Sequence, residues 1–96
     1  MAAKTQKPLN IGVLISGSGS NLQSLIDHIE EGTLDAEISL VVSSRPDAYG
    51  IERAKKAGIP VLVMNREAYA DAAAANQRIA DTLKEAGAEY VIMAGY

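Results

Sequence analysis

The residues with the clearest chemical potential are the glycines, serines and asparagine of ISGSGSNLQSLID, residues 15–27. Gly17 and Gly19 carry no Cβ, so they let the backbone turn and approach a ligand closely. Ser20 or Asn21 then begins a helix, whose first N–H groups have no partners within the helix and lie at the positive end of its dipole. Because such helix starts bind phosphate groups, this stretch predicts a phosphate site.

The same residues also fit a purely structural turn. Ser20 as N-cap, with Gln23 three residues on, would form a capping box that uses the same N–H groups internally. If a phosphate does bind, a dinucleotide is disfavoured, because Leu22 stands where its fingerprint has a third glycine, and Ser43 and Ser44 stand where it has an acidic residue. The lysine of a nucleotide-triphosphate loop is absent as well. The favoured ligand is therefore a monophosphate ester rather than NAD or ATP.

Apolar segments and helical patterns alternate along the chain, and together they must position this loop. Strands are predicted at residues 9–16, 37–44, 60–64 and 90–94, and helices at about 20–31, 49–57 and 67–86. Each helix is followed by a glycine, which favours a left-handed cap. This alternation predicts one domain of α/β class, a Rossmann-like open parallel sheet with the order βαβαβαβ. The almost continuously apolar first strand should be central.

In such sheets ligands bind beyond the carboxyl ends of the strands. The polar or glycine-bearing strand ends are residues 16–21, 43–45, 65–66 and 95–96. We expect a ligand site at this edge, with Asn65 as the N-cap of the third helix rather than a substrate contact.

The fourth strand, YVIMA, has an unusual character for an outer strand. In the strand order 3-2-1-4 it lies beside the first strand and would be an edge, yet it is apolar and uncharged throughout. Proteins ordinarily cover such an edge. We therefore expect the chain to be an amino-terminal fragment, truncated after this strand, which a carboxyl-terminal half or a second chain covers.

Composition excludes several classes of function. The net charge of −3 without a basic run argues against nucleic-acid or anionic-membrane partners. With no cysteine there is no disulfide and no thiolate metal site, and Asp71, Asp81 and Glu85 lack metal-ligand spacing with histidine, so we propose no metal. No apolar run is long enough to span a membrane. The sequence predicts a cytoplasmic protein with a flexible tail at residues 1–8.

Other charged residues are assigned structural roles. Residues 45–47, Arg-Pro-Asp, favour a helix-entry turn over a contact with an anionic ligand. Arg53, Lys55 and Lys56 fall in the carboxyl-terminal half of the second helix, where cations are stabilising, and should lie on a solvated face. His28 is expected at the surface.

Several longer stretches carry a resemblance to a known family. They are IGVLISGSGSNLQSLID, SSRPDAYGIERAKKAGIPV, NREAYADAAAANQRIADTL and YVIMAGY. Together they resemble the amino-terminal half of the phosphoribosylglycinamide formyltransferase family, over residues 9–96. The resemblance implies formyl transfer in purine biosynthesis, from the co-substrate 10-formyltetrahydrofolate to the amine of glycinamide ribonucleotide.

The resemblance also implies roles for particular residues. The phosphate of glycinamide ribonucleotide would be held by Gly19, Ser20 and Asn21. The folate side would be lined by Arg66, Met93 and Gly95. The family's catalytic Asn, His and Asp correspond to positions downstream of Tyr96, so the 96 residues alone are expected to be inactive.

Two alternative functions remain open at this point. One is another formyltetrahydrofolate-using enzyme of the same fold, although a hydrolase of free folate has no need of a phosphate loop. The other is a non-catalytic module that binds a nucleotide monophosphate.

Overall fold

The computed structural model describes residues 8–64 and 70–94. Its elements, in chain order, are β1 (Leu9–Ile15), α1 (Ser20–Glu31), β2 (Ala36–Ser43), α2 (Tyr49–Lys56), β3 (Val61–Val63), α3 (Ala72–Glu85) and β4 (Tyr90–Met93). The described strands form one parallel sheet in the order β3-β2-β1-β4. Both the predicted βαβαβαβ order and the α/β Rossmann-like class are confirmed.

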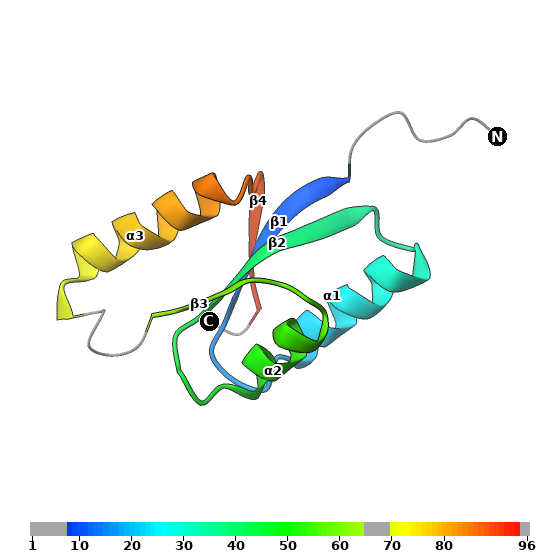
Figure 1. The fold of residues 1–96 in the computed structure, drawn as a ribbon, viewed down its shortest axis with the longest axis horizontal. Coiled ribbons are helices and arrows are strands. Elements are labelled where there is room, and N and C mark those ends of the chain that lie inside the picture. The colour runs from blue at the N-terminus through cyan, green and yellow to red at the C-terminus, as the bar shows by residue number, and fades with distance from the viewer. Residues whose placement is uncertain (1–7, 65–69, 95–96) are drawn as a thin grey trace.

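The helices cover both faces of the sheet (Figure 1). α1 and α2 pack on one face, where Val13, Ile15 and Leu22 are fully buried, and α3 packs on the other, against Leu14 and Val42. β1 lies between β2 and β4 and is buried from Ile11 onward, as its apolar sequence predicted. The loop that follows β1 is therefore attached to a buried, interior strand of the sheet.

A bulge in β2 keeps its apolar residues on the correct faces. Ile11 pairs with Ile38 but Gly12 pairs with Leu40, so Ser39 is the extra residue, and its hydroxyl donates to the Ile11 carbonyl at 3.4 Å. Because side chains otherwise alternate, the bulge lets Ile38 and Val41 face the same helical layer. The sequence pattern alone did not predict it.

The helices end at the predicted glycines, but α3 does not start at the predicted residue. Gly32, Gly58 and Gly87 all adopt positive φ angles between 74° and 82°. α3 begins at Ala72, later than predicted, and its N-cap is Asp71, whose carboxylate accepts the Ala74 N–H at 3.2 Å. Asn65 was therefore the wrong N-cap, and it lies outside the described residues. Both positions offer a suitable side chain, but only Asp71 directly precedes the alanine run.

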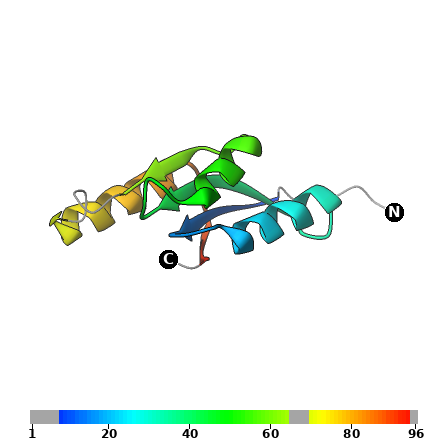
Figure 2. The ribbon, with the colours of Figure 1, turned by 90° about the horizontal axis from the view of Figure 1, so that it is seen from below.

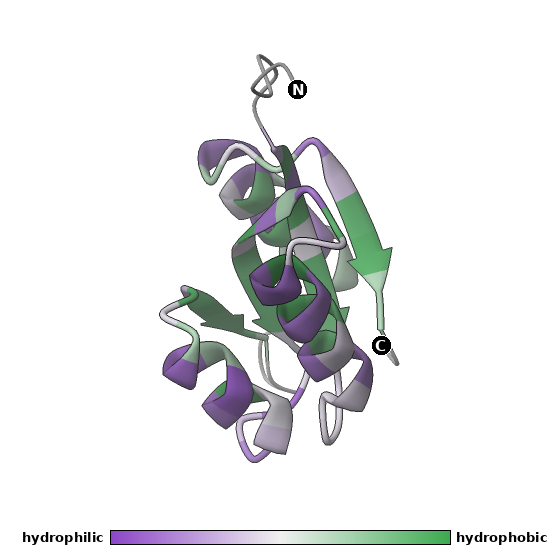
Figure 3. Ribbon diagram, turned by 90° about the vertical axis from the view of Figure 1, so that its right-hand side faces the viewer, coloured by the Kyte–Doolittle hydropathy of each residue, from purple (hydrophilic) through white to green (hydrophobic). Residues whose placement is uncertain are grey.

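β4 forms one margin of the described sheet, as predicted, and it is visible as an apolar strand at the edge in Figure 3. Its side chains are largely open to solvent: Tyr90 is 60% exposed, Val91 47% and Met93 67%.

Within the described ranges, no helix combines the length and apolarity needed to cross a bilayer.

Candidate functional site

The predicted loop lies at the carboxyl edge of the sheet, next to the end of β4. The Ala94 N–H donates to the Leu14 carbonyl at 2.8 Å, which places the end of β4 beside the end of β1 (Figure 2). A hollow of about 220 Å³ opens there, lined by Ser16, Gly17, Ser18, Gly19, Ser20, Asn21 and Ala94. The residues predicted to bind a phosphate are thus brought together around one polar hollow.

The N-cap of α1 is a glycine in the left-handed conformation. Gly19 is the N-cap, with φ 74° and ψ 26°, and its carbonyl accepts the Gln23 N–H at 2.8 Å. The N-cap Gly19 has no side chain that could cap the helix, and Ser20 is the first helical residue, so the alternative capping box with Ser20 as N-cap is wrong; the Gln23 amide instead bonds to Asp27 at 2.9 Å. The N–H groups of Ser20 and Asn21 therefore receive no bond from an N-cap side chain, and both residues are exposed.

Gly19 is required by a close approach of backbone to backbone. A Cβ on Gly19 would stand 2.5 Å from the Cα of Gly50 in α2, and its positive φ already disfavours other residues. The Gly50 N–H also donates to the Gly17 carbonyl at 3.1 Å. Gly17 itself has open space around it and an ordinary φ. Sequence reasoning did not single out Gly50.

Arg53 was wrongly assigned to a solvated face. It is half-buried, its Nε donates to the Ser18 carbonyl at 2.8 Å, and its Nη1 donates to the Gln23 Oε1 at 3.3 Å. The guanidinium also lies over the Tyr49 ring, 4.9 Å from its centroid. Lys55 and Lys56 are exposed, as predicted.

The polar residues that follow β2 serve a turn. Arg45 binds the Asp47 carboxylate through Nε at 3.1 Å and Nη2 at 2.9 Å, and the turn predicted for residues 45–47 is present. The hydrogen bond from Arg45, together with its positive charge, holds the pKa of Asp47 below its usual range. Ser43 is buried, donating to the Arg45 carbonyl at 2.7 Å. These groups are engaged with each other rather than directed at the hollow.

His28 lies on the last turn of α1 and is exposed, as predicted, with its Nδ1 3.0 Å from the Thr33 hydroxyl. It is the only histidine of the sequence. Since α1 begins at the hollow and His28 stands at the opposite end of that helix, the imidazole does not contribute to the hollow.

Comparison with known proteins identifies the family. The family model described as formyl transferase matches residues 9–96. The chain belongs to the formyl transferase family. Among curated relatives, the phosphoribosylglycinamide formyltransferase of Haemophilus influenzae is 41% identical over 86 residues, covering 90% of this chain and 41% of the relative. The bovine trifunctional purine biosynthetic protein adenosine-3 is 41% identical over 90 residues, covering 94% of this chain and 9% of the relative.

Solved structures of the formyl transferase family agree with the fold. The glycinamide ribonucleotide transformylase 1 of Symbiobacterium toebii is 44% identical with a TM-score of 0.87, over 93% of this chain and 42% of that one. That of Geobacillus kaustophilus is 35% identical with a TM-score of 0.88, over 93% of this chain and 47% of that one. The chain thus spans less than half the length of these relatives.

In this formyl transferase chain, Met93 lines a second hollow beside the first. This hollow has a volume of about 290 Å³ and is lined by Asn21, Ser24, Leu25, Ile92, Met93 and Ala94. The two hollows share Asn21 and Ala94. Met93, predicted for the folate side, therefore lies near the predicted phosphate residues, while Arg66 and Gly95 lie outside the described residues.

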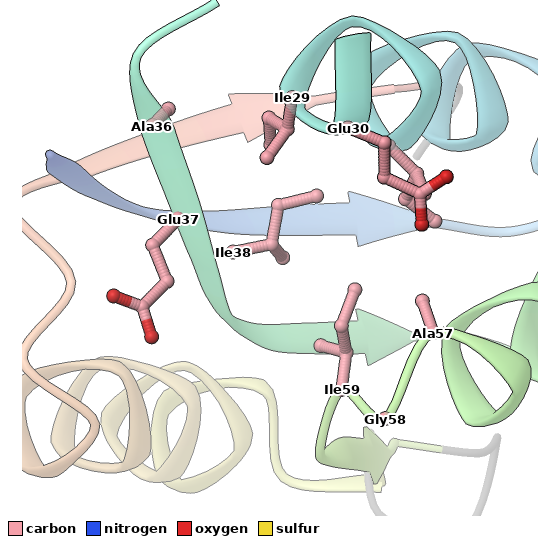
Figure 4. A pocket seen from close by; sticks show the side chains of 9 residues that line it. Ile29, Glu30, Ala36, Glu37, Ile38, Ala57, Gly58 and Ile59 are labelled. Atoms are coloured by element: carbon pink, nitrogen blue, oxygen red, sulfur yellow. The ribbon is translucent and has the colours of Figure 1, made fainter. Parts of the chain in front are cut away.

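A third groove, of about 260 Å³, lies at the other end of the formyl transferase sheet. The isoleucine side chains Ile29, Ile38 and Ile59 converge on it (Figure 4), and the carboxylate-bearing Glu30 and Glu37 line it without any lysine or arginine. Two carboxylates without a cation repel an anion. The hollow at the start of α1 is therefore the better candidate for a phosphate.

Proposed function

We propose that this chain carries the substrate-phosphate part of a phosphoribosylglycinamide formyltransferase. In this reaction the amine of glycinamide ribonucleotide attacks the formyl carbon of 10-formyltetrahydrofolate, a new C–N bond forms, and the bond from formyl carbon to folate nitrogen breaks. The observation that carries the proposal is the start of α1 on Gly19, an N-cap residue that offers no side-chain bond to the first N–H groups of the helix. Relatives named for this activity support it.

In this proposal the phosphate is bound mainly by backbone. The N–H groups at Gly19, Ser20 and Asn21 donate to its oxygens, and the Ser20 hydroxyl and Asn21 amide add to them from exposed positions. A hydrogen bond to a charged group contributes about 1.5–3 kcal/mol. A few such bonds suffice for a dissociation constant on the order of micromolar.

The co-substrate is proposed to lie on the Met93 side of the site. 10-formyltetrahydrofolate supplies the formyl group, and the apolar hollow at Leu25, Ile92 and Met93 suits part of its ring system. Arg66 and Gly95 remain proposed contacts on this side. Amine attack also needs a group that stabilises the oxyanion and a group that moves a proton. We propose that residues beyond Tyr96 supply both.

A further polypeptide segment, in the same chain or a second one, is proposed to cover β4. Support comes from the exposed Tyr90, Val91 and Met93 on this edge and from the share of the relatives' length that the chain spans. An uncharged edge strand offers unpaired N–H and C=O groups to another strand.

Calorimetric titration of the purified chain with glycinamide ribonucleotide tests the phosphate assignment. Asn21→Ala should weaken binding about tenfold through loss of a side-chain contact. Gly19→Val should weaken it further, because a branched side chain blocks both the turn and the anion. Asn76→Ala, an exposed asparagine on α3, is the matched control and should bind like the wild type. Equal binding by all variants, or none by the wild type, contradicts the assignment.

A further inference from the structure

Two groups of α2 donate hydrogen bonds to successive carbonyl groups of the loop between β1 and α1. The Gly50 N–H donates to the Gly17 carbonyl at 3.1 Å, and the Arg53 Nε donates to the Ser18 carbonyl at 2.8 Å. These carbonyls belong to adjacent peptide groups. α2 therefore fixes the orientation of two consecutive peptide planes in the loop that the proposed function uses.

The orientation of the carbonyls also determines that of the N–H groups. The described residues contain no cis peptide bond, and in a trans peptide the C=O and N–H point in opposite directions. With the Gly17 and Ser18 carbonyls directed at α2, the N–H groups of Ser18 and Gly19 point away from it. Successive N–H groups on one side, ending in a left-handed residue such as Gly19, form the concave anion seat known as a nest.

Arg53 is itself firmly held. Its Nη1 donates to the Gln23 Oε1 on α1 at 3.3 Å, its guanidinium lies over Tyr49, and its side chain is half-buried. The side chain thus connects α2, the loop and α1. A cation placed to bind an anion directly would instead direct its donors into the polar hollow, whose lining does not include Arg53.

We propose that Arg53 is a positioning residue of the phosphate loop: by binding the Ser18 carbonyl it turns the Gly19 N–H toward the anion. This inference rests on the proposed function, since it assigns Arg53 a task in the same site. In this proposal the effect of Arg53 passes through the Ser18–Gly19 peptide and not through a contact with the substrate.

Three variants separate positioning from charge. The amide nitrogen that Arg53→Gln introduces is as many bonds from Cα as the arginine Nε, so this variant keeps a donor for the Ser18 carbonyl without the charge. Arg53→Lys keeps the charge but not the planar donor, and Arg53→Ala removes both. Lys56→Ala, which removes an exposed cation from the same helix, is the matched control.

Calorimetry with glycinamide ribonucleotide should distinguish these variants. We expect Arg53→Ala to weaken binding about tenfold, which corresponds to about 1.4 kcal/mol. Arg53→Gln should restore binding to within about threefold of the wild type, Arg53→Lys should restore less, and Lys56→Ala should have no effect. If Arg53→Lys binds like the wild type while Arg53→Gln binds as weakly as Arg53→Ala, the residue acts by charge and the proposal is overturned.

A second measurement tests the loop geometry without the ligand, so that a loss of binding through poor folding is not mistaken for a loss of positioning. In ¹⁵N spectra of the ligand-free protein, the Gly19 amide resonance should move in Arg53→Ala and return toward its original position in Arg53→Gln, since it is sensitive to the geometry and hydrogen bonding of the Ser18–Gly19 peptide. An unmoved Gly19 resonance overturns the proposal. If Arg53→Ala binds glycinamide ribonucleotide as tightly as the wild type does, this inference alone is overturned. If the wild type does not bind glycinamide ribonucleotide, the proposed function is overturned as well.

Discussion

Gly19 and Gly50 pack backbone to backbone, so closely that a Cβ on Gly19 would stand 2.5 Å from the Gly50 Cα. A Cβ on Gly50 would in turn collide with the Ile15 side chain and stand 3.1 Å from the Gly19 Cα. This contact brings the start of α2 against the loop, within reach of the Gly17 carbonyl. The geometry of the loop is therefore set as much by α2 as by its own residues.

The first prediction compares two glycines of the loop. Gly19→Ala should lower the free energy of unfolding by more than about 1 kcal/mol, because a left-handed conformation alone costs about 1–2 kcal/mol and the contact with Gly50 adds to it. Gly17→Ala, with open space and an ordinary φ, should change stability by less than about 0.5 kcal/mol. Urea denaturation measures both. Equal effects would mean that the Gly19–Gly50 contact does not constrain the loop.

Much of the fold was predictable because its signals are local. The apolar run of β1 indicated a central strand, and the glycines after the helices indicated their ends, as Gly32 and Gly87 show. The position of Gly19, Ser20 and Asn21 around one hollow could also be predicted from the sequence, since it depends only on a strand that leads directly into a helix.

The missed features depend on contacts between distant residues. Arg53 reaches a carbonyl 35 residues earlier in the chain, and no local pattern of helix charges reveals that. The capping of α1 was wrong for a related reason: Ser20 is a good N-cap by type, but the approach of Gly50 demands a residue without Cβ one position earlier, at Gly19. Tertiary packing overrode the local preference.

The second prediction contrasts two helix starts. Asp71→Ala should destabilise the protein by about 1 kcal/mol, because the carboxylate accepts the Ala74 N–H and caps α3. Ser20→Ala should have a smaller effect on stability, since Ser20 is not a cap. Thermal unfolding of both variants tests this. A larger loss in Ser20→Ala would indicate that its hydroxyl supports α1 after all.

The third prediction concerns the dependence of stability on pH. The hydrogen bond and charge of Arg45 lower the pKa of Asp47 in the folded protein, so the ionised form stabilises the fold at neutral pH. That contribution is present above the unfolded-state pKa of about 4 and disappears as the pH falls through the lower, folded-state pKa. Asp47→Asn should therefore be less stable than the wild type near pH 7 and should converge with it well below pH 4. Urea titrations across this range, with high salt as a control, measure the difference, and a gap that persists in acid would contradict the assignment.

The last prediction concerns the exposed edge at β4. In the 96-residue chain on its own, Val91 and Met93 leave an apolar strand open to pairing with a second copy. Val91→Lys places a charge on that edge and should lower the weight-average sedimentation coefficient at high protein concentration, because a lysine must be desolvated when strands pair. Ala80→Lys adds the same charge at an exposed position of α3 and should leave association unchanged. If both lysines reduce association equally, net charge rather than the β4 edge controls it, and β4 would no longer be the favoured surface for a covering segment.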